Sequence, residues 1–164
     1  MLERAIFCRI GWMKYYDGKK PDDPRPIGGG SWNKRYPGSE RFNFRNIRGK
    51  YYGFCRPSRS HNINLERIDP TSQGNFLERV LVVFVAVDPD LRNQRVVGWY
   101  KNATVYRLLQ KSPPGRESVR YLAVANAKDS VLLRTEPYER NWHVVAGTGG
   151  IGESNACYLP RGPG

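Results

Sequence analysis

The sequence is poor in the residues that build metal sites and disulfide frameworks. Its 164 residues include three cysteines, at positions 8, 55 and 157, and two histidines, at positions 61 and 143. The cysteines are odd in number and widely spaced, so they match neither a disulfide framework nor a zinc-ligand pattern. We therefore expect buried, reduced thiols, no metal ion and no cofactor.

Long apolar runs and catalytic motifs are also absent from the sequence. No apolar stretch approaches the roughly 20 residues of a membrane span, and the N-terminus lacks the apolar segment of a signal peptide. We expect a cytoplasmic protein with no membrane partner. Neither histidine has a nucleophile or carboxylate at motif spacing, and no HExxH, nucleophile elbow or nuclease-like carboxylate cluster occurs. These absences argue against an enzyme.

Acidic residues are scarce relative to basic ones. The chain has 27 Lys and Arg against 15 Asp and Glu, a formal net charge of +12. Residues 1–68 hold 15 basic and 6 acidic residues, net +9, whereas residues 69–164 hold 12 and 9, net +3. Residues 34–59 alone hold eight basic residues and one acid, Glu40. This concentration is the footprint of a nucleic-acid binder, although a basic face that only aids solubility gives similar totals.

The clearest β pattern covers residues 80–107. Residues 80–87 form an unbroken apolar run, which is typical of a strand buried on both faces. Residues 96–105 form a second β-rich run after a polar loop that starts with Asp-Pro-Asp turn chemistry. The two runs predict an antiparallel pair.

Gly98 interrupts the second of these strands immediately before Trp99 and Tyr100. A glycine inside a strand weakens it, and often marks a β-bulge or a close approach to the backbone. This segment is therefore a candidate site.

The rest of the chain contributes short strands and many turns. Four further runs are candidate strands, at residues 5–16, 50–56, 61–68 and 142–146. Residues 121–127 fit a strand or a helix equally well. Many short strands, few convincing helices and abundant Gly and Pro favour an α+β, mainly β fold, a small β-barrel flanked by one to three helices. We expect one domain over residues 1–160 and a frayed tail over 161–164.

Aromatic rings alternate with cations in the basic half of the chain. Nucleobases present flat π-faces and phosphates present negative charge, so a surface of rings and cations suits both. The candidate phosphate ligands are Lys14, Lys34, Arg35, Arg45, Arg48, Lys50, Arg56 and Arg59. The candidate rings of a base pocket are Trp12, Tyr15, Tyr16, Trp32 and Trp99. Core packing explains any single ring as well, so the prediction concerns the set.

Short polar residues near these rings are candidates for reading a base edge, because an amide offers both a donor and an acceptor. They are Asp17, Ser31, Asn43 and Asn102. All four residue types are common turn formers. Asn43 and Asn102 also stand between apolar or aromatic residues, where a side-chain amide needs a partner.

Several phrases of the sequence resemble a known family. They are RIGWMKYYDG (9–18), GGGSWN (28–33), GSERFNF (38–44), YYGF (51–54), VVGWYKNATVYR (96–107) and GESNACY (152–158). Together, over residues 5–159, they resemble the N-terminal domain of bacterial restriction-like proteins, in which it commonly precedes an HNH nuclease domain. More remotely, the hairpin with its Gly-Trp pair resembles the PUA-like superfamily of EVE, YTH and SRA domains. The resemblance implies a PUA-like β-barrel with flanking helices, and an aromatic cage that takes in a modified or flipped base.

Two features depart from the family pattern. No HNH nuclease segment follows within the sequence, so a nuclease is expected only in a full-length or partner protein. Cys157 stands where a second aromatic residue is expected. The sequence thus predicts a module without chemistry of its own that recognises a modified base, methylation being the first expectation, in double-stranded DNA by base flipping. A YTH-type reader of modified single-stranded RNA, a nuclease or nuclease fragment, and a protein-interaction domain remain alternatives.

Overall fold

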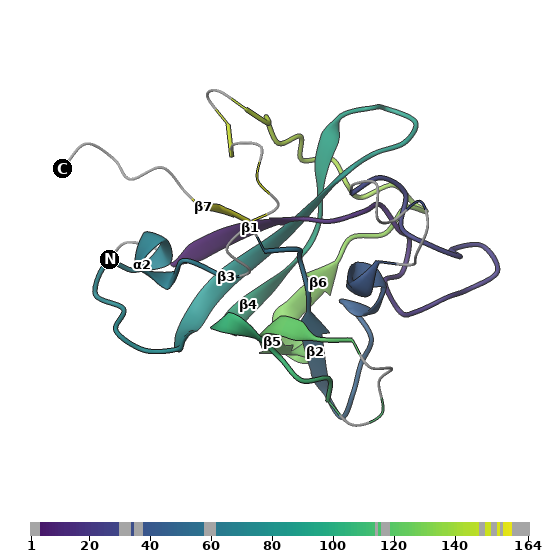
Figure 1. Ribbon diagram of the computed structural model, residues 1–164. Coiled ribbons are helices and arrows are strands. Elements are labelled where there is room, and N and C mark those ends of the chain that lie inside the picture. The colour runs from purple at the N-terminus through teal and green to yellow at the C-terminus, as the bar shows by residue number, and fades with distance from the viewer. Residues whose placement is uncertain are drawn as a thin grey trace.

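The fold is mainly β (Figure 1). The computed structural model describes residues 4–29, 34, 38–57, 62–113, 115, 119–147, 150–151, 154 and 156–158. Its helical elements are short: α2 (Leu65–Ile68) and the 3-10 turns η1 (Ser39–Phe42) and η2 (Ala127–Asp129). In the described part of the chain, no helix has the length and apolar character needed to cross a membrane.

One mixed sheet contains all seven strands that the described residues form. The strands are β1 (Ala5–Arg9), β2 (Lys50–Gly53), β3 (Phe76–Val87), β4 (Gln94–Gln110), β5 (Tyr121–Asn126), β6 (Ser130–Leu132) and β7 (Ala156–Tyr158). Six of them follow the order β2-β5-β4-β3-β1-β7, and β6 pairs with β4 beside this path. The β1–β3 pair is parallel, and the other pairs are antiparallel.

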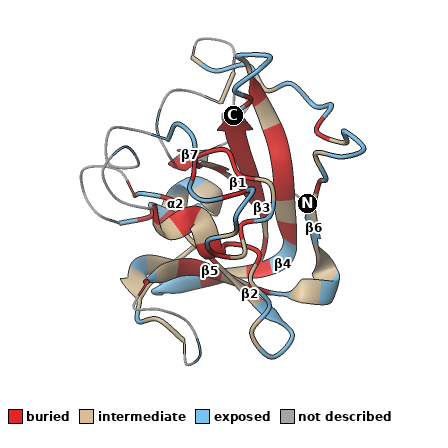
Figure 2. Cartoon of the chain, turned by 90° about the vertical axis from the view of Figure 1, so that its right-hand side faces the viewer, coloured by how far each residue is buried: buried red, intermediate tan, exposed pale blue. Residues whose placement is uncertain are grey.

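The predicted mainly β class is confirmed, but the predicted closed barrel is wrong. Strands β2 and β7 end the strand order, and no pairing joins them in the described residues. The register of β4 against β3 shifts in three places, and each bulge bends and twists the ladder. The long β3–β4 pair stands upright in Figure 2, whereas β2 and β5 lie across its lower end. The sheet therefore curls without closing.

The predicted hairpin of residues 80–107 is confirmed as β3 and β4. Val82 and Phe84 face one side of the sheet, and Val83 and Val85 face the other, so β3 is buried on both faces as its unbroken apolar run predicts. In the connecting loop, the carboxylate of Asp88 accepts hydrogen bonds from backbone N–H groups at 2.8 and 3.0 Å. This Asx-type turn is the turn chemistry expected of the loop.

Two apolar clusters lie on the two faces of the sheet. The larger one, the main core, contains Ile6, Val82, Phe84 and Tyr100, among other residues. The smaller one, the outer cluster, consists of Val83, Val85, Val96 and Leu133, with Phe7, Leu81, Trp99, Val144 and Ile151 packed against it. The segment that follows β6 thus covers the second face of the sheet.

A β-bulge beside Gly98 decides which cluster Trp99 joins. Val85 of β3 pairs with Val96 of β4, whereas the preceding residue, Phe84, pairs with Gly98. An advance of one residue along β3 therefore corresponds to two residues along β4. The extra residue inverts the alternation of side chains. Trp99 therefore packs against the outer cluster and Tyr100 enters the main core. The predicted bulge is confirmed.

The predicted close approach at Gly98 is confirmed as well. A Cβ atom at this position would lie 2.5 Å from the carbonyl oxygen of Val131 in β6 and 2.7 Å from Cζ of Phe44. Glycine is required here because β6 and the Phe44 ring occupy the space of a side chain.

The remaining predictions of strands have mixed outcomes. Residues 50–56 form β2 in their first half, residues 121–127 form β5, and residues 5–16 form β1 followed by an isolated bridge of Trp12 with Ile27. Residues 142–146 supply only a bridge of His143 with Arg95. The strand predicted within residues 61–68 is wrong, because Asn64 caps helix α2: its Oδ1 accepts from the N–H of Arg67 at 3.2 Å.

Cys8 and Cys55 are buried free thiols, as predicted. Contact with Cys8, together with burial, raises the pKa of the Cys55 thiol. A raised pKa keeps this sulfur protonated and unreactive. The side chain of Cys157 lies outside the described residues.

Candidate functional site

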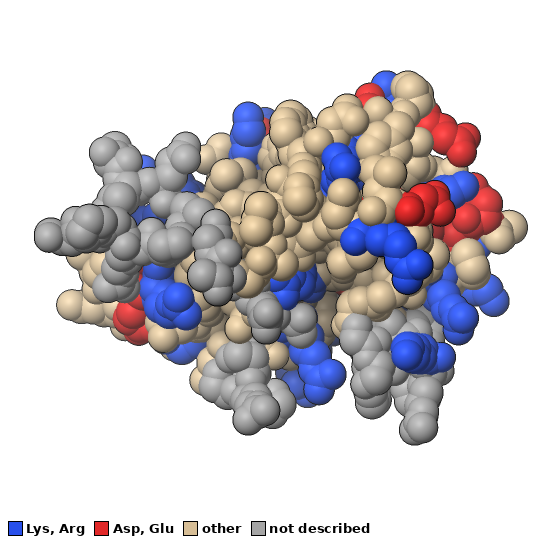
Figure 3. Space-filling view, turned by 90° about the horizontal axis from the view of Figure 1, so that it is seen from above, with Lys and Arg blue, Asp and Glu red and all other residues tan. Residues whose placement is uncertain are grey.

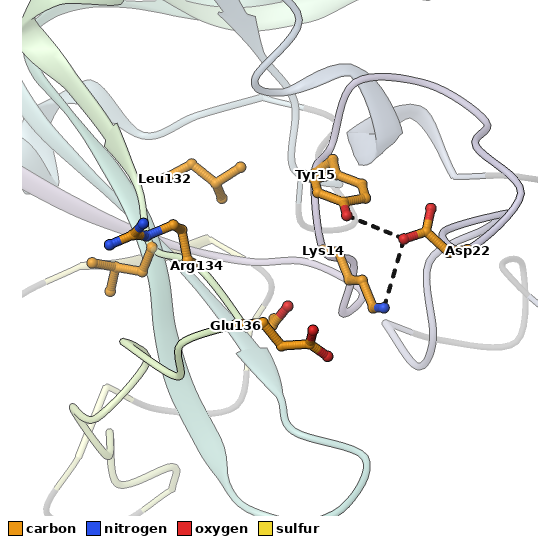
Figure 4. Close-up of a pocket in the computed structure, with 8 residues that line it drawn as sticks. Lys14, Tyr15, Asp22, Leu132, Arg134 and Glu136 are labelled. Carbon is orange, nitrogen blue, oxygen red and sulfur yellow. Dashed lines mark hydrogen bonds and ion pairs between the residues drawn. The ribbon is translucent and has the colours of Figure 1, made fainter.

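A pocket of about 200 Å³ opens between the loop that follows β1 and the segment that follows β6 (Figure 4). Its lining residues are Lys14, Tyr15, Asp22, Leu132, Leu133, Arg134, Thr135 and Glu136. Sites for drug-sized ligands span roughly 300–1,000 Å³, so this pocket suits a single small ring system. It includes two residues of the predicted interface, Lys14 and Tyr15.

The buried carboxylate of Asp23 shapes the loop wall of the pocket. It accepts hydrogen bonds from the backbone N–H groups of Lys14 at 2.9 Å and Tyr15 at 2.8 Å. The base of the loop is closed by a pair of backbone hydrogen bonds between Trp12 and Ile27, at 2.7 and 2.9 Å. Because a buried carboxylate needs such partners, the backbone at positions 14 and 15 is fixed by the loop itself.

Tyr15 presents an exposed ring whose hydroxyl group is held in place. The side chain is 41% exposed, and its hydroxyl donates to Oδ2 of Asp22 at 3.1 Å. Nζ of Lys14 lies 3.7 Å from the same oxygen, as Figure 4 shows. The hydrogen bond to Asp22 raises the pKa of Tyr15, so the phenol stays neutral at physiological pH. The Lys20 ammonium lies over one face of this ring, 5.2 Å from its centre, so a stacked ligand would use the opposite face.

The opposite wall combines apolar and charged side chains. Leu132 and Leu133 give it an apolar part, and Arg134 and Glu136 give it a cation and a carboxylate. The guanidinium of Arg134 lies 2.6 Å from Oε1 of Glu139, which lowers the pKa of that carboxyl. Each wall thus holds a hydrogen-bond donor and an acceptor beside apolar surface, an arrangement that suits a flat polar ring.

The side chain of Arg140 forms hydrogen bonds to both walls of the pocket. It is completely buried, and its guanidinium donates to the carbonyl oxygens of Met13 at 2.7 Å, Lys14 at 3.1 Å and Leu133 at 3.0 Å. It also lies 4.4 Å from the ring centre of Trp12. Burial lowers the pKa of Arg140, but a guanidinium remains protonated in proteins. Sequence reasoning missed this residue, because it stands in a polar stretch that reads as a loop.

Trp12 and Tyr16, two predicted rings of the base pocket, lie in the main core. Trp12 is 7% exposed and Tyr16 is fully buried, with its hydroxyl donating to the Gly11 carbonyl at 2.7 Å. Burial raises the pKa of Tyr16. Neither ring offers a free face to a ligand in this structure. Trp99 packs against the other cluster, so the structure does not bring Trp12 and Trp99 together.

The predicted polar residues have different surroundings. Asn43 is buried, and its amide pairs with the backbone of Phe54, donating at 2.9 Å and accepting at 2.8 Å. The Tyr100 hydroxyl donates to the backbone carbonyl oxygen of Asn43. Asn102 is exposed, with a φ of 51° at a second bulge of β4. Asp17 lies 3.3 Å from the Lys20 ammonium. Asn43 thus has the partner that its context predicted, and that partner is backbone.

The described phosphate candidates are accessible to solvent. Lys34, Arg48, Lys50 and Arg56 are exposed. Arg45 is partly exposed and lies 5.5 Å from the ring centre of Phe42. In Figure 3, Lys and Arg atoms are spread over the visible face, whereas most of the Asp and Glu atoms gather at its right-hand end. The predicted residues Ser31, Trp32, Arg35 and Arg59 lie outside the described residues.

The described side chains include no group of three or more His, Cys, Asp or Glu residues that could hold a metal ion. Comparison of the chain with protein-family models, curated proteins and solved structures found no match. The function is therefore inferred from the site and from the sequence motifs.

Proposed function

We propose that this chain is a nucleic-acid-binding module that recognises a modified base in double-stranded DNA by accepting the flipped base in the pocket beside Tyr15. The observation that carries the proposal is the pocket itself. It combines an exposed aromatic ring with donors and acceptors on both walls, in a chain of net charge +12. The family resemblance of the motifs supports the same reading.

The energetics of base flipping are compatible with this pocket. Extruding a base costs a few kcal/mol in lost stacking and pairing, and the cost is smallest for a mismatched or damaged base. Stacking on one aromatic ring returns about 1–3 kcal/mol. Asp22 and Glu136 are acceptors, whereas Lys14 and Arg134 are donors, so the pocket can hydrogen-bond to a base edge.

Exposed cations supply the contacts to phosphate in this proposal. Arg48 and Lys50 flank the tight turn at Gly49, and Arg45 precedes them in the same basic segment. Phosphate contacts fix the position of the protein on the duplex without reading its sequence. In the proposed module, the pocket selects which base is bound, and these cations supply most of the affinity.

The proposed module performs no chemistry on the base. Its relation to modification-dependent restriction proteins and to PUA-like readers rests on the motifs alone, since the sheet is open. A nuclease domain would belong to a longer chain or to a partner protein.

A panel of duplexes tests the proposal. Each duplex carries one common modified base at a single position, and each is titrated against the wild type, Tyr15→Ala and Tyr15→Phe. We expect one modification to be preferred, Tyr15→Ala to lose that preference, and Tyr15→Phe to keep most of it because the ring remains. Phe76→Ala is the matched control, since Phe76 is an exposed aromatic residue, 52% accessible, on β3 outside the pocket lining.

Equal binding of every duplex would refute the modified-base reading. Stronger binding of a modified single-stranded RNA than of any duplex would instead identify an RNA reader. A fluorescent base analogue at the preferred position provides a second readout, because it brightens when it leaves the stack. An analogue that stays quenched at saturation would show that the base is read inside the helix.

A further inference from the structure

The partly buried Trp99 and the exposed Trp142 form a pair on the sheet face that carries the outer cluster. The ring centres of Trp99 and Trp142 lie 5.7 Å apart, with the ring planes inclined by 58°. Trp142 is 56% exposed, and Val131, the cross-strand neighbour of Trp99 in β6, is 39% exposed. Isolated exposed apolar residues are ordinary, but a contiguous patch of large ones marks an interaction site.

Backbone hydrogen bonds hold this pair in place. The N–H of Val96 donates to the Trp142 carbonyl at 3.0 Å, and the N–H of Val144 donates to the Gln94 carbonyl at 2.9 Å. The guanidinium of Arg95 donates to the Asn141 carbonyl at 3.0 Å. Trp142 is therefore anchored along β4 by its backbone, while its indole ring is left largely in solvent.

Cationic and ionisable side chains border the pair. Lys101 is exposed and stands two residues after Trp99 in β4, beside the bulge at Asn102. The Arg95 guanidinium is held at the Asn141 carbonyl by its hydrogen bond, and His143 is exposed directly after Trp142. Rings bordered by positive charge are complementary to unpaired bases joined by phosphates.

We propose that Trp99 and Trp142 form a stacking surface for unpaired bases of a single-stranded nucleic acid, separate from the pocket beside Tyr15. Stacking on indole rings tolerates any base, because every base has a π-face. This surface therefore supplies affinity for unpaired strand without base preference, whereas the pocket supplies the preference. This inference depends on the proposed function in one respect, namely that the partner is a nucleic acid.

The two sites are close in the fold. Leu132 lines the pocket, and its neighbour Val131 is the cross-strand neighbour of Trp99. Leu133 also lines the pocket, and it belongs to the outer cluster against which Trp99 packs. Base flipping leaves the partner of the flipped base unpaired, and the tryptophan pair can stack against such an unpaired base.

The test is a titration with an eight-nucleotide oligodeoxythymidylate, followed by quenching of tryptophan fluorescence and by anisotropy of a labelled strand. We expect Trp142→Ala to weaken binding about tenfold and Trp142→Phe to retain most of it. Lys101→Ala should weaken binding and reduce the steepness of the salt dependence by about one unit of the log–log slope. Phe76→Ala, the loss of an exposed aromatic residue elsewhere, should change neither.

Three controls keep the outcome decisive. Because Trp142 is mostly exposed, its replacement should leave the melting temperature close to that of the wild type, which circular dichroism checks. Trp142→Ala should leave the ratio of affinities for modified and unmodified duplex unchanged, whereas Tyr15→Ala should abolish that ratio. The experiment can therefore refute the proposed pocket without refuting the stacking surface, and the reverse.

Two results would overturn the inference. One is equal oligothymidylate affinity for Trp142→Ala and the wild type. The other is a wild-type dimer that Trp142→Ala converts to a monomer in sedimentation without any change in oligonucleotide binding, since the patch would then be an interface between copies of the chain.

Discussion

The guanidinium of Arg140 lies 4.4 Å from the ring centre of Trp12, with both side chains inside the protein. The same guanidinium reaches backbone carbonyls on both walls of the pocket. A cation over an indole face is stabilised by the ring quadrupole, and more so when it is desolvated. This contact therefore links the core of the protein to the geometry of the pocket.

Replacing Arg140 with methionine should destabilise the protein and disturb the pocket. Two buried carbonyl groups and one partly buried carbonyl group lose a charged donor, and a hydrogen bond of this kind contributes about 1.5–3 kcal/mol. We expect a loss of at least about 2 kcal/mol in urea unfolding. Arg134→Met is the matched control, because Arg134 makes an exposed ion pair, which is typically worth about 0–1 kcal/mol. Equal stabilities of the two variants would show that Arg140 does not hold the walls together.

Trp12→Ala should behave as a core substitution. The side chain is 7% exposed and packs in the main core, so its removal leaves a cavity that costs about 3–5 kcal/mol. We expect a large drop in melting temperature, while the fraction that remains folded keeps its preference among duplexes. A stable Trp12→Ala protein without that preference would instead place Trp12 in the binding site.

Gly98→Ala should destabilise the sheet through overpacking. The added methyl group would meet the Val131 carbonyl at 2.5 Å and Phe44 at 2.7 Å, and the first of these contacts is with backbone. We expect a loss of about 1–3 kcal/mol, read from the denaturant midpoint. Gly74→Ala is the control, because its nearest atom would lie at 3.9 Å. If both substitutions had the same effect, the close approach of β6 would not constrain position 98.

The β3–β4 hairpin and the bulge at Gly98 could be predicted because their signals are local. An unbroken apolar run, a turn with Asp and Pro, and a glycine inside a strand each act over a few residues. The direction of Trp99 could not be predicted, because one extra residue in β4 moves its side chain to the other face of the sheet. Whether the sheet closes depends on pairing between β2 and β7, which no local pattern encodes.

The candidate site was predicted in part. Tyr15 was predicted as a ring of a base pocket and Lys14 as a phosphate ligand, and both line the pocket. Trp12 and Tyr16, from the same stretch, lie in the main core, because composition does not distinguish a ring that stacks on a ligand from a ring that packs inside. Arg140 and the second wall come from residues 132–140, and only tertiary contacts bring that segment against the loop after β1.

Acid should weaken the link between α2 and β4. Glu66 accepts two hydrogen bonds from Arg107, at 2.7 and 3.0 Å, and this contact lowers the pKa of Glu66 from 4.5 to about 2. A lowered folded-state pKa contributes stability that is complete above pH 4.5 and is lost as the pH falls toward 2. The wild type should therefore lose more stability than Glu66→Gln between these two values, with Glu78→Gln as the control. If the stabilities of the wild type and Glu66→Gln fell in parallel between these pH values, the Glu66–Arg107 ion pair would not contribute to stability.

The most direct test of the account is the salt dependence of binding to a duplex with the preferred modified base and to its unmodified parent. If about six phosphates are neutralised, the log–log slope should be about −5 for both duplexes between about 50 and 200 mM salt. The ratio of the two affinities should stay constant over that range, because only the phosphate contacts release counterions. A slope shallower than about −2, or a ratio of one at every salt concentration, would contradict a basic module that reads a modified base in its pocket.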